Sequence, residues 1–278
     1  MKKHTTFRIG GPAQYYVTPE NKEAVIAVIR LCREEKIPYY VIGNGSNLLV
    51  SDEGWRGLIL STEKLCQCQV SGDRICAGAG VQLARMAKAA KEASLTGLEF
   101  AAGIPGTLGG ALVMNAGAYG SEMKCVLISA TVLKPDGDVE KIPAEALELG
   151  YRTSCIPREE YIVLEAEVQL EKGDMEAIQA RMDDLAYQRR SKQPLEYPSA
   201  GSTFKRPVGY FAGKLIDDAG LRGFQVGGAQ VSEKHCGFVI NKDHATAQDV
   251  MNLCQAVKDK VMDRFGVELE MEVKRLGL

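Results

Sequence analysis

The chain has 278 residues, of which 45% are hydrophobic and 25% are charged, so its composition is that of an ordinary globular protein. At about 150 residues per domain, this length predicts roughly two compact units. The formal net charge of −2 leaves no positive excess for a polyanion and argues against a dedicated nucleic-acid-binding protein. The 29 glycines exceed the usage of roughly 7% found in average proteins, and a surplus gathered in loops is typical of ligand binding by the backbone.

Cysteine and histidine form no recognisable site. The eight cysteines contain no CxxC pair, and none of the three histidines lies at metal-ligand spacing from them. We therefore expect no metal, and buried reduced thiols in a cytoplasmic protein. The first residues lack the apolar segment of a secretory signal, and the uncharged run over 100–121 is too rich in glycine for a membrane helix. We accordingly expect no membrane partner.

The first two thirds of the chain alternate between helix and strand signals, which favours an α/β arrangement at its start. The predicted elements are a helix over 21–36, strands over 39–42, 48–50, 58–60 and 74–77, a helix over 81–94, a hairpin over 125–142 that turns at Asp136-Gly137, and a strand over 161–170.

The last third begins after a break at 191–201, where two prolines predict a domain boundary. Before it we expect an amphipathic helix over 174–190, with Met175, Ile178, Met182 and Leu185 on one stripe. After it we expect a helix over 211–218, an extended segment over 223–231, a long helix from Thr246 to Gly266, and an alternating strand over 267–275. In that strand, alternation places Glu268, Glu270 and Glu272 on a solvated face.

A first glycine-rich loop, Gly43-Asn44-Gly45-Ser46-Asn47, lies between two predicted strands. It lacks the third glycine and the following helix of a dinucleotide fingerprint. The backbone N–H groups of this loop can converge, and together with the side chains of Ser46 and Asn47 they could bind a phosphate. A tight hairpin loop without a ligand would explain the same sequence pattern equally well.

A second loop runs from Gly103 through Ile104-Pro105-Gly106 and Gly109-Gly110 to Asn115-Ala116-Gly117-Ala118. A helix opening at Gly106 would present free N–H groups to an anion, and Gly109 and Gly110 would let a ring or backbone pack closely. Ordering so much glycine without a ligand would cost conformational entropy, so we favour a ligand here. Two such loops without a Walker or Rossmann motif indicate a nucleotide-type cofactor on another scaffold.

These loops are part of a wider set of segments that closely resembles the UDP-N-acetylenolpyruvoylglucosamine reductase (MurB) family. The resemblance is carried in order by HTTFRIGGPA (4–13), GNGSNLLV (43–50), GIPGTLGGALVMNAGAYG (103–120), GYR (150–152), AGSTFKRP (200–207) and LEMEV (269–273). It implies an α+β protein with a PCMH (vanillyl-alcohol-oxidase) type FAD-binding fold of two subdomains, plus an α/β substrate-binding domain. The expected parts are 1–61 with 266–278, then 62–191, then 192–265 for substrate, with the last strand returning to the first.

The activity that the resemblance implies is NADPH-dependent reduction of UDP-N-acetylglucosamine enolpyruvate to UDP-N-acetylmuramate, through non-covalent FAD, in peptidoglycan synthesis. NADPH is then the hydride-donating cosubstrate. We expect the enzyme to be cytoplasmic and to be a monomer or weak dimer. The expected FAD-binding residues are Gly43, Asn44, Gly45, Ser46, Asn47, Gly103, Ile104, Pro105, Gly106, Gly109, Gly110, Asn115, Ala116, Gly117 and Ala118. The implied substrate contacts are Tyr151, Lys192 and Arg206, the last of which replaces an asparagine found in some members.

Arg152, Ser202 and Glu272 match the family's catalytic positions. Arginine suits a developing carboxylate charge because it is always cationic and binds in a bidentate manner. Ser202 matches the proton donor to C2, a weak acid that requires a strongly basic intermediate. Read alone, Arg152 is a surface arginine and Ser202 an ordinary loop residue, and the carboxylate could equally be Glu270.

Two other functions remain open at this point. One is an oxidase of the same flavin superfamily that uses dioxygen, against which the arginine, serine and glutamate argue. The other is a non-catalytic module in which both glycine loops bind nucleotide phosphate. The segment 188–202 resembles the shorter subclass of the family without an inserted tyrosine loop, so no tyrosine is assigned there.

Overall fold

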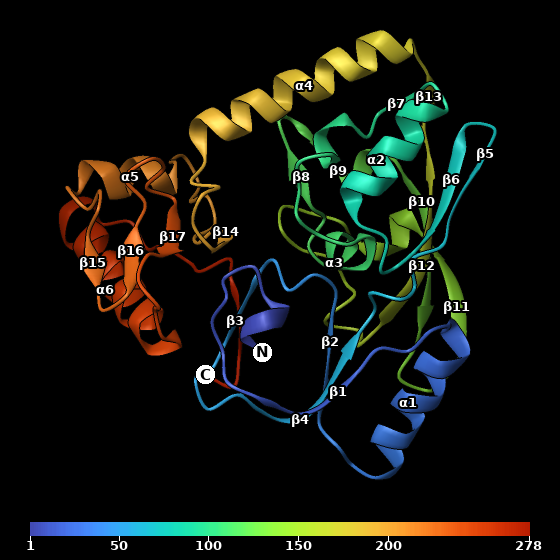
Figure 1. Cartoon of the computed structure of the whole chain (residues 1–278), viewed down its shortest axis with the longest axis horizontal. Coiled ribbons are helices and arrows are strands. Elements are labelled where there is room, and N and C mark those ends of the chain that lie inside the picture. Colours follow the sequence, from blue (N-terminus) through green and yellow to red (C-terminus); the bar gives the residue numbers. More distant parts are fainter. The chain divides into compact units, whose positions relative to one another are not determined.

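The computed structural model describes all 278 residues, which form two compact units (Figure 1). Unit 1 contains residues 1–14, 45–56 and 190–278, and unit 2 contains residues 15–44 and 57–189. The chain passes between them within strand β1 (Ala13–Val17), after Asn44, within β4 (Trp55–Ser61) and within helix α4 (Met175–Lys192). None of the helices combines the length and the apolar character needed to cross a bilayer.

Unit 2 is built around an antiparallel sheet with the strand order β11-β10-β12-β6-β5. Its strands are β5 (Cys68–Ser71), β6 (Arg74–Gly78), β10 (Leu127–Leu133), β11 (Val139–Pro143) and β12 (Ile162–Gln169). Along β12, Leu164, Ala166 and Val168 are buried, while the intervening Glu165 and Glu167 are partly exposed. Helices α2 (Leu83–Glu92) and α3 (Leu108–Val113) pack on this sheet, and their buried residues share one core with its apolar face.

The start of unit 2 follows the sequence prediction closely. Helix α1 (Lys22–Glu34) buries Val25, Ile29 and Cys32, and the Asn21 side chain accepts a hydrogen bond of 2.8 Å from the Ala24 N–H at its first turn. Strand β2 (Tyr39–Ile42) pairs in parallel with β4, as expected for strands joined through a crossover. The short strands of the unit pair as β7 (Leu95–Thr96) with β13 (Glu171–Lys172), and β8 (Gly117–Ala118) with β9 (Ser121–Glu122).

Unit 1 has a four-stranded sheet in the order β14-β17-β16-β15, with α6 (Ala247–Phe265) packed against β15 and β16 and α5 (Ala212–Asp218) against α6. The strands are β14 (Ser199–Ser202), β15 (Gln225–Val226), β16 (Ala229–Val231) and β17 (Phe238–Asn241). Helix α6 begins with a capping box, in which the side chains of Thr246 and Asp249 accept hydrogen bonds from each other's backbone N–H groups, and it ends as predicted at Gly266, which has φ +66°.

The expected three-part division differs from the two units. Phe7, Ile9 and Leu49 share one hydrophobic core with the buried face of α6, so the residues 1–14 and 45–56 join the C-terminal part of the chain. Burial of these apolar side chains explains the grouping. The longer segment of unit 2, residues 57–189, ends close to the predicted boundary at 191–201.

The alternating strand expected over 267–275 is wrong for most of its length. Only β18 (Lys274–Leu276) is a strand, and it pairs in parallel with β3 (Leu48–Val50) and not with the first strand of the chain. The preceding residues are held by an isolated bridge between Phe204 and Met271. Alternation fails at Glu272, which is buried together with its neighbour Val273.

Two expectations about side-chain burial also need correction. All eight cysteines are free, but three of them are exposed and not buried as we expected. Cys66 lies in a loop, Cys76 on the polar face of β6, and Cys125 in a short helical turn. Cys254 is buried in α6, and this burial raises the pKa of its thiol to about 12. On α4, Ile178 and Leu185 are buried as predicted, whereas Met175 at the first position is 49% exposed.

Candidate active site

The two glycine-rich loops meet within unit 2. Gly43 and Asn44 follow β2 directly, and the Asn44 side-chain amide donates a hydrogen bond of 2.7 Å to the Pro105 carbonyl. A Cβ atom added at Gly43 would lie 2.0 Å from Thr107 Oγ1, so only glycine permits this approach. The fold therefore joins two segments that the sequence singled out separately.

A hollow of about 210 Å³ lies at this junction. It is lined by Gly43, Asn44, Glu63, Cys66, Gly80, Gln82, Arg85 and Thr107. Thr107 is only 3% exposed, and its Oγ1 has no hydrogen-bond partner in the protein. A buried hydroxyl without a partner is costly, so this atom is suited to a polar group of a bound ligand. Sequence reasoning missed Thr107 and Arg85, although Thr107 lies inside the loop that it selected.

The expected anion site at the start of a helix is wrong. Helix α3 begins at Leu108, two residues after Gly106. Its first N–H groups are already used, because Leu108 donates to the Val81 carbonyl at 2.8 Å and Gly109 to the Ala79 carbonyl at 2.9 Å. A Cβ atom at Gly109 would lie 3.0 Å from the Ala79 Cβ, so this glycine serves close packing within the protein.

The loop after β2 is not the tight hairpin that its sequence allowed. Strands β2 and β3 belong to different sheets, since β2 pairs with β4 and β3 with β18. In unit 1, the Asn47 side-chain amide donates a hydrogen bond of 3.2 Å to the Glu272 carbonyl. Ser46 and Gly45 accept hydrogen bonds from Thr6 through their carbonyls, at 3.4 Å and 3.3 Å. This loop therefore anchors the segment that contains Glu272.

Asn115 is part of the scaffold of unit 2. It is fully buried, its amide donates to the Gly150 carbonyl at 3.1 Å, and its Oδ1 accepts from the Lys124 N–H at 2.9 Å. Arg152 lies two residues after Gly150 with φ +55°, and its Nη2 donates to the Gly117 carbonyl at 3.2 Å. The glycine-rich loop and the segment of Arg152 thus hold each other in place. Both polar atoms of the Asn115 side chain already bond within the protein, and its expected contact with the cofactor stays a prediction.

Arg189, near the end of α4, is a further residue that the sequence did not reveal. Its side chain lies against the second loop, where a Cβ atom at Gly103 would be 3.2 Å from Arg189 Cδ. Burial lowers the pKa of Arg189, and no carboxylate forms an ion pair with it. A partly buried cation without a counter-charge suits an anionic ligand.

Ser202 and Glu272 lie in neighbouring segments of unit 1. The Glu272 N–H donates to the Thr203 carbonyl at 2.8 Å, and the Lys205 N–H donates to the Glu270 carbonyl at 2.8 Å. Ser202, the last residue of β14, is exposed, whereas Glu272 is 9% exposed. The Glu270 carboxylate points instead to an exposed ion pair with Lys205 at 2.5 Å. The structure therefore distinguishes the two glutamates.

The three expected substrate contacts are surface residues. Tyr151 is 54% exposed, with the Arg152 guanidinium carbon 5.3 Å from its ring centroid. Lys192 is the exposed last residue of α4. The Arg206 guanidinium stacks on the Phe211 ring at 3.8 Å, and Phe211 is itself 61% exposed.

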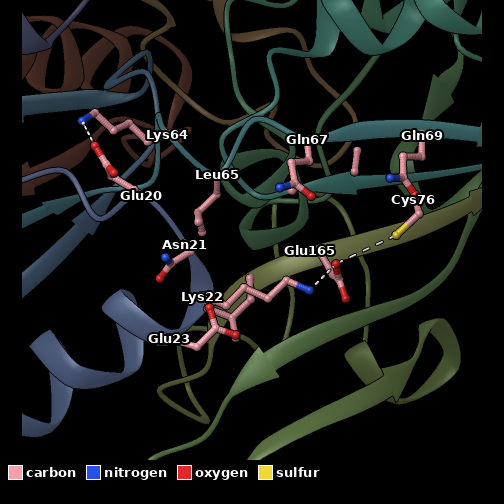
Figure 2. Close-up of a pocket in the computed structure, with 13 residues that line it drawn as sticks. Glu20, Asn21, Lys22, Glu23, Lys64, Leu65, Gln67, Gln69, Cys76 and Glu165 are labelled. Atoms are coloured by element: carbon pink, nitrogen blue, oxygen red, sulfur yellow. Dashed lines mark hydrogen bonds and ion pairs between the residues drawn. The ribbon is translucent and has the colours of Figure 1, made fainter.

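A larger hollow, of about 300 Å³, lies on the polar side of the unit 2 sheet (Figure 2). Figure 2 shows Lys22 paired with Glu165, Lys64 paired with Glu20 at 2.8 Å, and the Cys76 thiol turned toward Glu165. Both lysines are therefore neutralised within the protein, and none of the predicted site residues lines this hollow. It offers no unpaired cation to the phosphates of a cofactor.

Comparisons with known proteins agree with this arrangement. A family model described as "FAD binding domain" matches residues 13–143, and one described as "UDP-N-acetylenolpyruvoylglucosamine reductase, C-terminal domain" matches residues 193–276. The UDP-N-acetylenolpyruvoylglucosamine reductase of Clostridium novyi is 52% identical over 277 residues, which span 100% of this chain and 90% of the relative. That of Clostridium botulinum (strain Hall) is 53% identical with the same coverage. The crystal structure of the reductase from Thermus caldophilus superimposes with a TM-score of 0.86 at 36% identity, covering 99% of this chain and 96% of that one.

Proposed function

The chain belongs to the UDP-N-acetylenolpyruvoylglucosamine reductase (MurB) family, and we propose that Arg152, Ser202 and Glu272 act on the enolpyruvyl group of the family's substrate. The chain is an FAD-dependent oxidoreductase of α+β fold that uses NADPH to reduce UDP-N-acetylglucosamine enolpyruvate to UDP-N-acetylmuramate, a step of peptidoglycan synthesis. The observation that carries the residue roles is the pairing of residues 203–205 with 270–272, which brings Ser202 and Glu272 into adjacent segments.

The residues of unit 2 fit an FAD molecule. Thr107 Oγ1 lacks a partner inside the protein, Gly43 leaves a wall of bare backbone, and Arg189 is a cation without a counter-charge. When bound, FAD carries the hydride from NADPH to C3 of the enolpyruvyl group. The residues proposed to hold FAD are Gly43–Asn47, Gly103–Gly106, Gly110 and Ala116–Ala118, while Gly109 and Asn115 shape the loop from within.

Ser202 donates the proton from its Oγ to C2 of the substrate once the hydride has arrived at C3. The neighbouring Thr203 is 1% exposed and fixes the backbone, since its Oγ1 accepts from the Val239 N–H at 2.9 Å and its own N–H donates to Gly237 at 2.8 Å. A rigid backbone with an exposed hydroxyl suits a positioned proton donor.

Arg152 and Glu272 act on the carboxylate side of the same group. Negative charge develops at C2 and on the carboxylate when hydride adds to C3, and a guanidinium stabilises this charge through paired hydrogen bonds. The buried Glu272 helps to polarise the substrate. Tyr151, Lys192 and Arg206 provide the outer contacts, with the two cations suited to the diphosphate.

The remaining features of the proposal concern the whole protein. We place FAD binding in two subdomains, 1–61 with 266–278 and 62–191, and the substrate domain in 192–265. We propose a cytoplasmic monomer or weak dimer without nucleic-acid or membrane partners. Anaerobic reduction by NADPH followed by reoxidation with the enolpyruvyl substrate distinguishes this reductase from a dioxygen-dependent oxidase of similar fold.

The role of Ser202 is tested with Ser202→Ala and the control Ser199→Ala, which lies in the same strand. Stopped-flow absorbance measures the two half-reactions separately. We expect Ser202→Ala to retain flavin reduction by NADPH and to slow reoxidation by substrate about 10²–10⁴-fold, the usual contribution of a general acid. Ser199→Ala should retain both rates. Unchanged reoxidation in Ser202→Ala would show that this serine is not the proton donor.

A further inference from the structure

We propose that the hollow beside Thr107 holds the AMP half of the flavin cofactor, and that Arg85 is a cofactor-binding residue there, pairing with the adenylate phosphate. The inference rests on FAD binding by this protein and assigns one end of that cofactor to residues that neither the glycine-rich loops nor the catalytic set include. All residues that line the hollow belong to unit 2.

Arg85 brings the positive charge to the hollow. It lies on the first turn of α2, is exposed, and forms no ion pair. Its Nη1 donates to the Cys66 carbonyl at 3.0 Å, which orients the guanidinium on the wall and leaves its other N–H groups for a ligand. A guanidinium held in this way is suited to a phosphate because it presents parallel donors.

Thr107 gives the hollow a second donor on another wall. Its hydroxyl is buried and lacks a partner in the protein, so a phosphate or ribose oxygen would satisfy it. Gly43 and Gly80 contribute backbone to the lining, and packing within the protein requires both glycines, because a Cβ atom would lie 2.0 Å from Thr107 Oγ1 at Gly43 and 1.9 Å from the Thr62 carbonyl oxygen at Gly80.

The size and the remaining lining select part of a dinucleotide. A volume of about 210 Å³ is below the roughly 300–1,000 Å³ of pockets that enclose a whole drug-sized ligand. The Glu63 carboxylate and the Gln82 amide, both on exposed residues of the lining, offer acceptors for ribose hydroxyl groups. Arg85 can therefore bind the phosphate, and Glu63 or Gln82 can bind the ribose. These two groups belong to the AMP half of FAD.

The first experiment compares flavins of different length on the flavin-free protein. Quenching of flavin fluorescence gives the Kd of FAD, FMN and riboflavin for wild type, Arg85→Gln and Arg85→Lys. The control is Lys88→Gln, a charge on the same helix that is 68% exposed and pairs with Glu92. Thermal unfolding of each flavin-free variant checks that the fold is retained.

We expect Arg85→Gln to raise the Kd of FAD about 10- to 100-fold, which is the effect of losing one charge-assisted hydrogen bond. The Kd values of FMN and riboflavin should change by less than about twofold. Arg85→Lys should recover part of the loss because it keeps a point charge. Unchanged FAD binding in Arg85→Gln, or an equal loss for FMN, overturns the assignment. Failure of the wild type to bind any flavin would instead overturn the cofactor of the proposed function.

A second readout needs no substitution. Cys66 is exposed and lines the hollow, so bound FAD should protect it from iodoacetamide, whereas the exposed Cys76 and Cys125 serve as internal references. Peptide mass spectrometry should show that FAD and AMP slow the alkylation of Cys66 at least tenfold and that riboflavin does not. Reaction of Cys66 at its unprotected rate in the FAD-saturated protein overturns the proposal. Protection by NADPH and not by FAD also overturns it, because the hollow would then hold the other dinucleotide.

Discussion

The backbone N–H of Glu272 donates a hydrogen bond of 2.8 Å to the carbonyl oxygen of Thr203, the residue that follows Ser202. This bond joins segments that are about 70 residues apart in sequence. Asn47 adds a second tie, because its side-chain amide donates to the Glu272 carbonyl. Both peptide groups of Glu272 are therefore fixed, and the orientation of its carboxylate depends on the backbone of the serine segment and on the first glycine-rich loop.

The first prediction separates Glu272 from Glu270. Glu272→Gln should slow flavin reoxidation by the enolpyruvyl substrate about 10- to 1,000-fold, because the isosteric amide keeps the packing but removes the charge that polarises the substrate. Flavin reduction by NADPH should stay within about twofold. Glu270→Gln breaks only the exposed pair with Lys205, so both rates should be retained. A larger loss in Glu270→Gln would transfer the catalytic role to that residue.

The second prediction concerns Asn115, which we now expect to stabilise the fold. Asn115→Ala removes two side-chain hydrogen bonds of a fully buried residue and leaves the Lys124 N–H unpaired, while the Gly150 carbonyl keeps its hydrogen bond from the Thr153 N–H. The free energy of unfolding should fall by about 2–4 kcal/mol, measured by urea denaturation of the flavin-free protein. Asn252→Ala, on the exposed side of α6, should change it by less than about 0.5 kcal/mol. If Asn115→Ala had normal stability but bound FAD more weakly, Asn115 would be a cofactor contact and not a stabilising residue.

The elements that local sequence determines were predicted well. The helices predicted over 21–36 and from Thr246 to Gly266 depend on capping residues and apolar positions within one or two turns, and the structure confirms both as α1 and α6. The two glycine-rich loops approach each other closely, as the position of Gly43 beside Thr107 shows, and their role in cofactor binding stays a prediction.

The features that sequence reasoning missed depend on partners far along the chain. The amides of Leu108 and Gly109 look free in the sequence, and the carbonyls of Val81 and Ala79 occupy them only in the fold. Glu272 follows a polar alternation until its segment pairs with residues 203–205 and becomes buried. Arg85 and Thr107 line one hollow although they are more than 20 residues apart, and no local pattern links them.

The third prediction is a pH dependence of stability that originates at His235 in unit 1. Burial lowers the pKa of His235 below its ordinary value of 6.5, and the nearby Arg222 acts in the same direction. The hydrogen bond of 3.1 Å that Nδ1 accepts from the Gly237 N–H requires the neutral form of the ring. The His235 and Phe238 rings are packed in a T-shaped arrangement, with their centroids 5.0 Å apart. Protonation of His235 would therefore lose this acceptor.

The sign follows from the protons bound in each state. Between pH 6.5 and the lower pKa of the folded protein, the unfolded chain binds a proton at His235 that the folded chain does not. The free energy of unfolding should therefore decrease as the pH falls below 6.5, by at most about 1.4 kcal/mol per pH unit from this group. Urea denaturation of wild type and His235→Asn between pH 5 and 8 measures the difference in slope. His235→Asn should be less sensitive to acid, whereas the control His244→Asn, at an exposed position, should follow the wild type. Parallel curves for wild type and His235→Asn would show that acid sensitivity originates elsewhere in the chain.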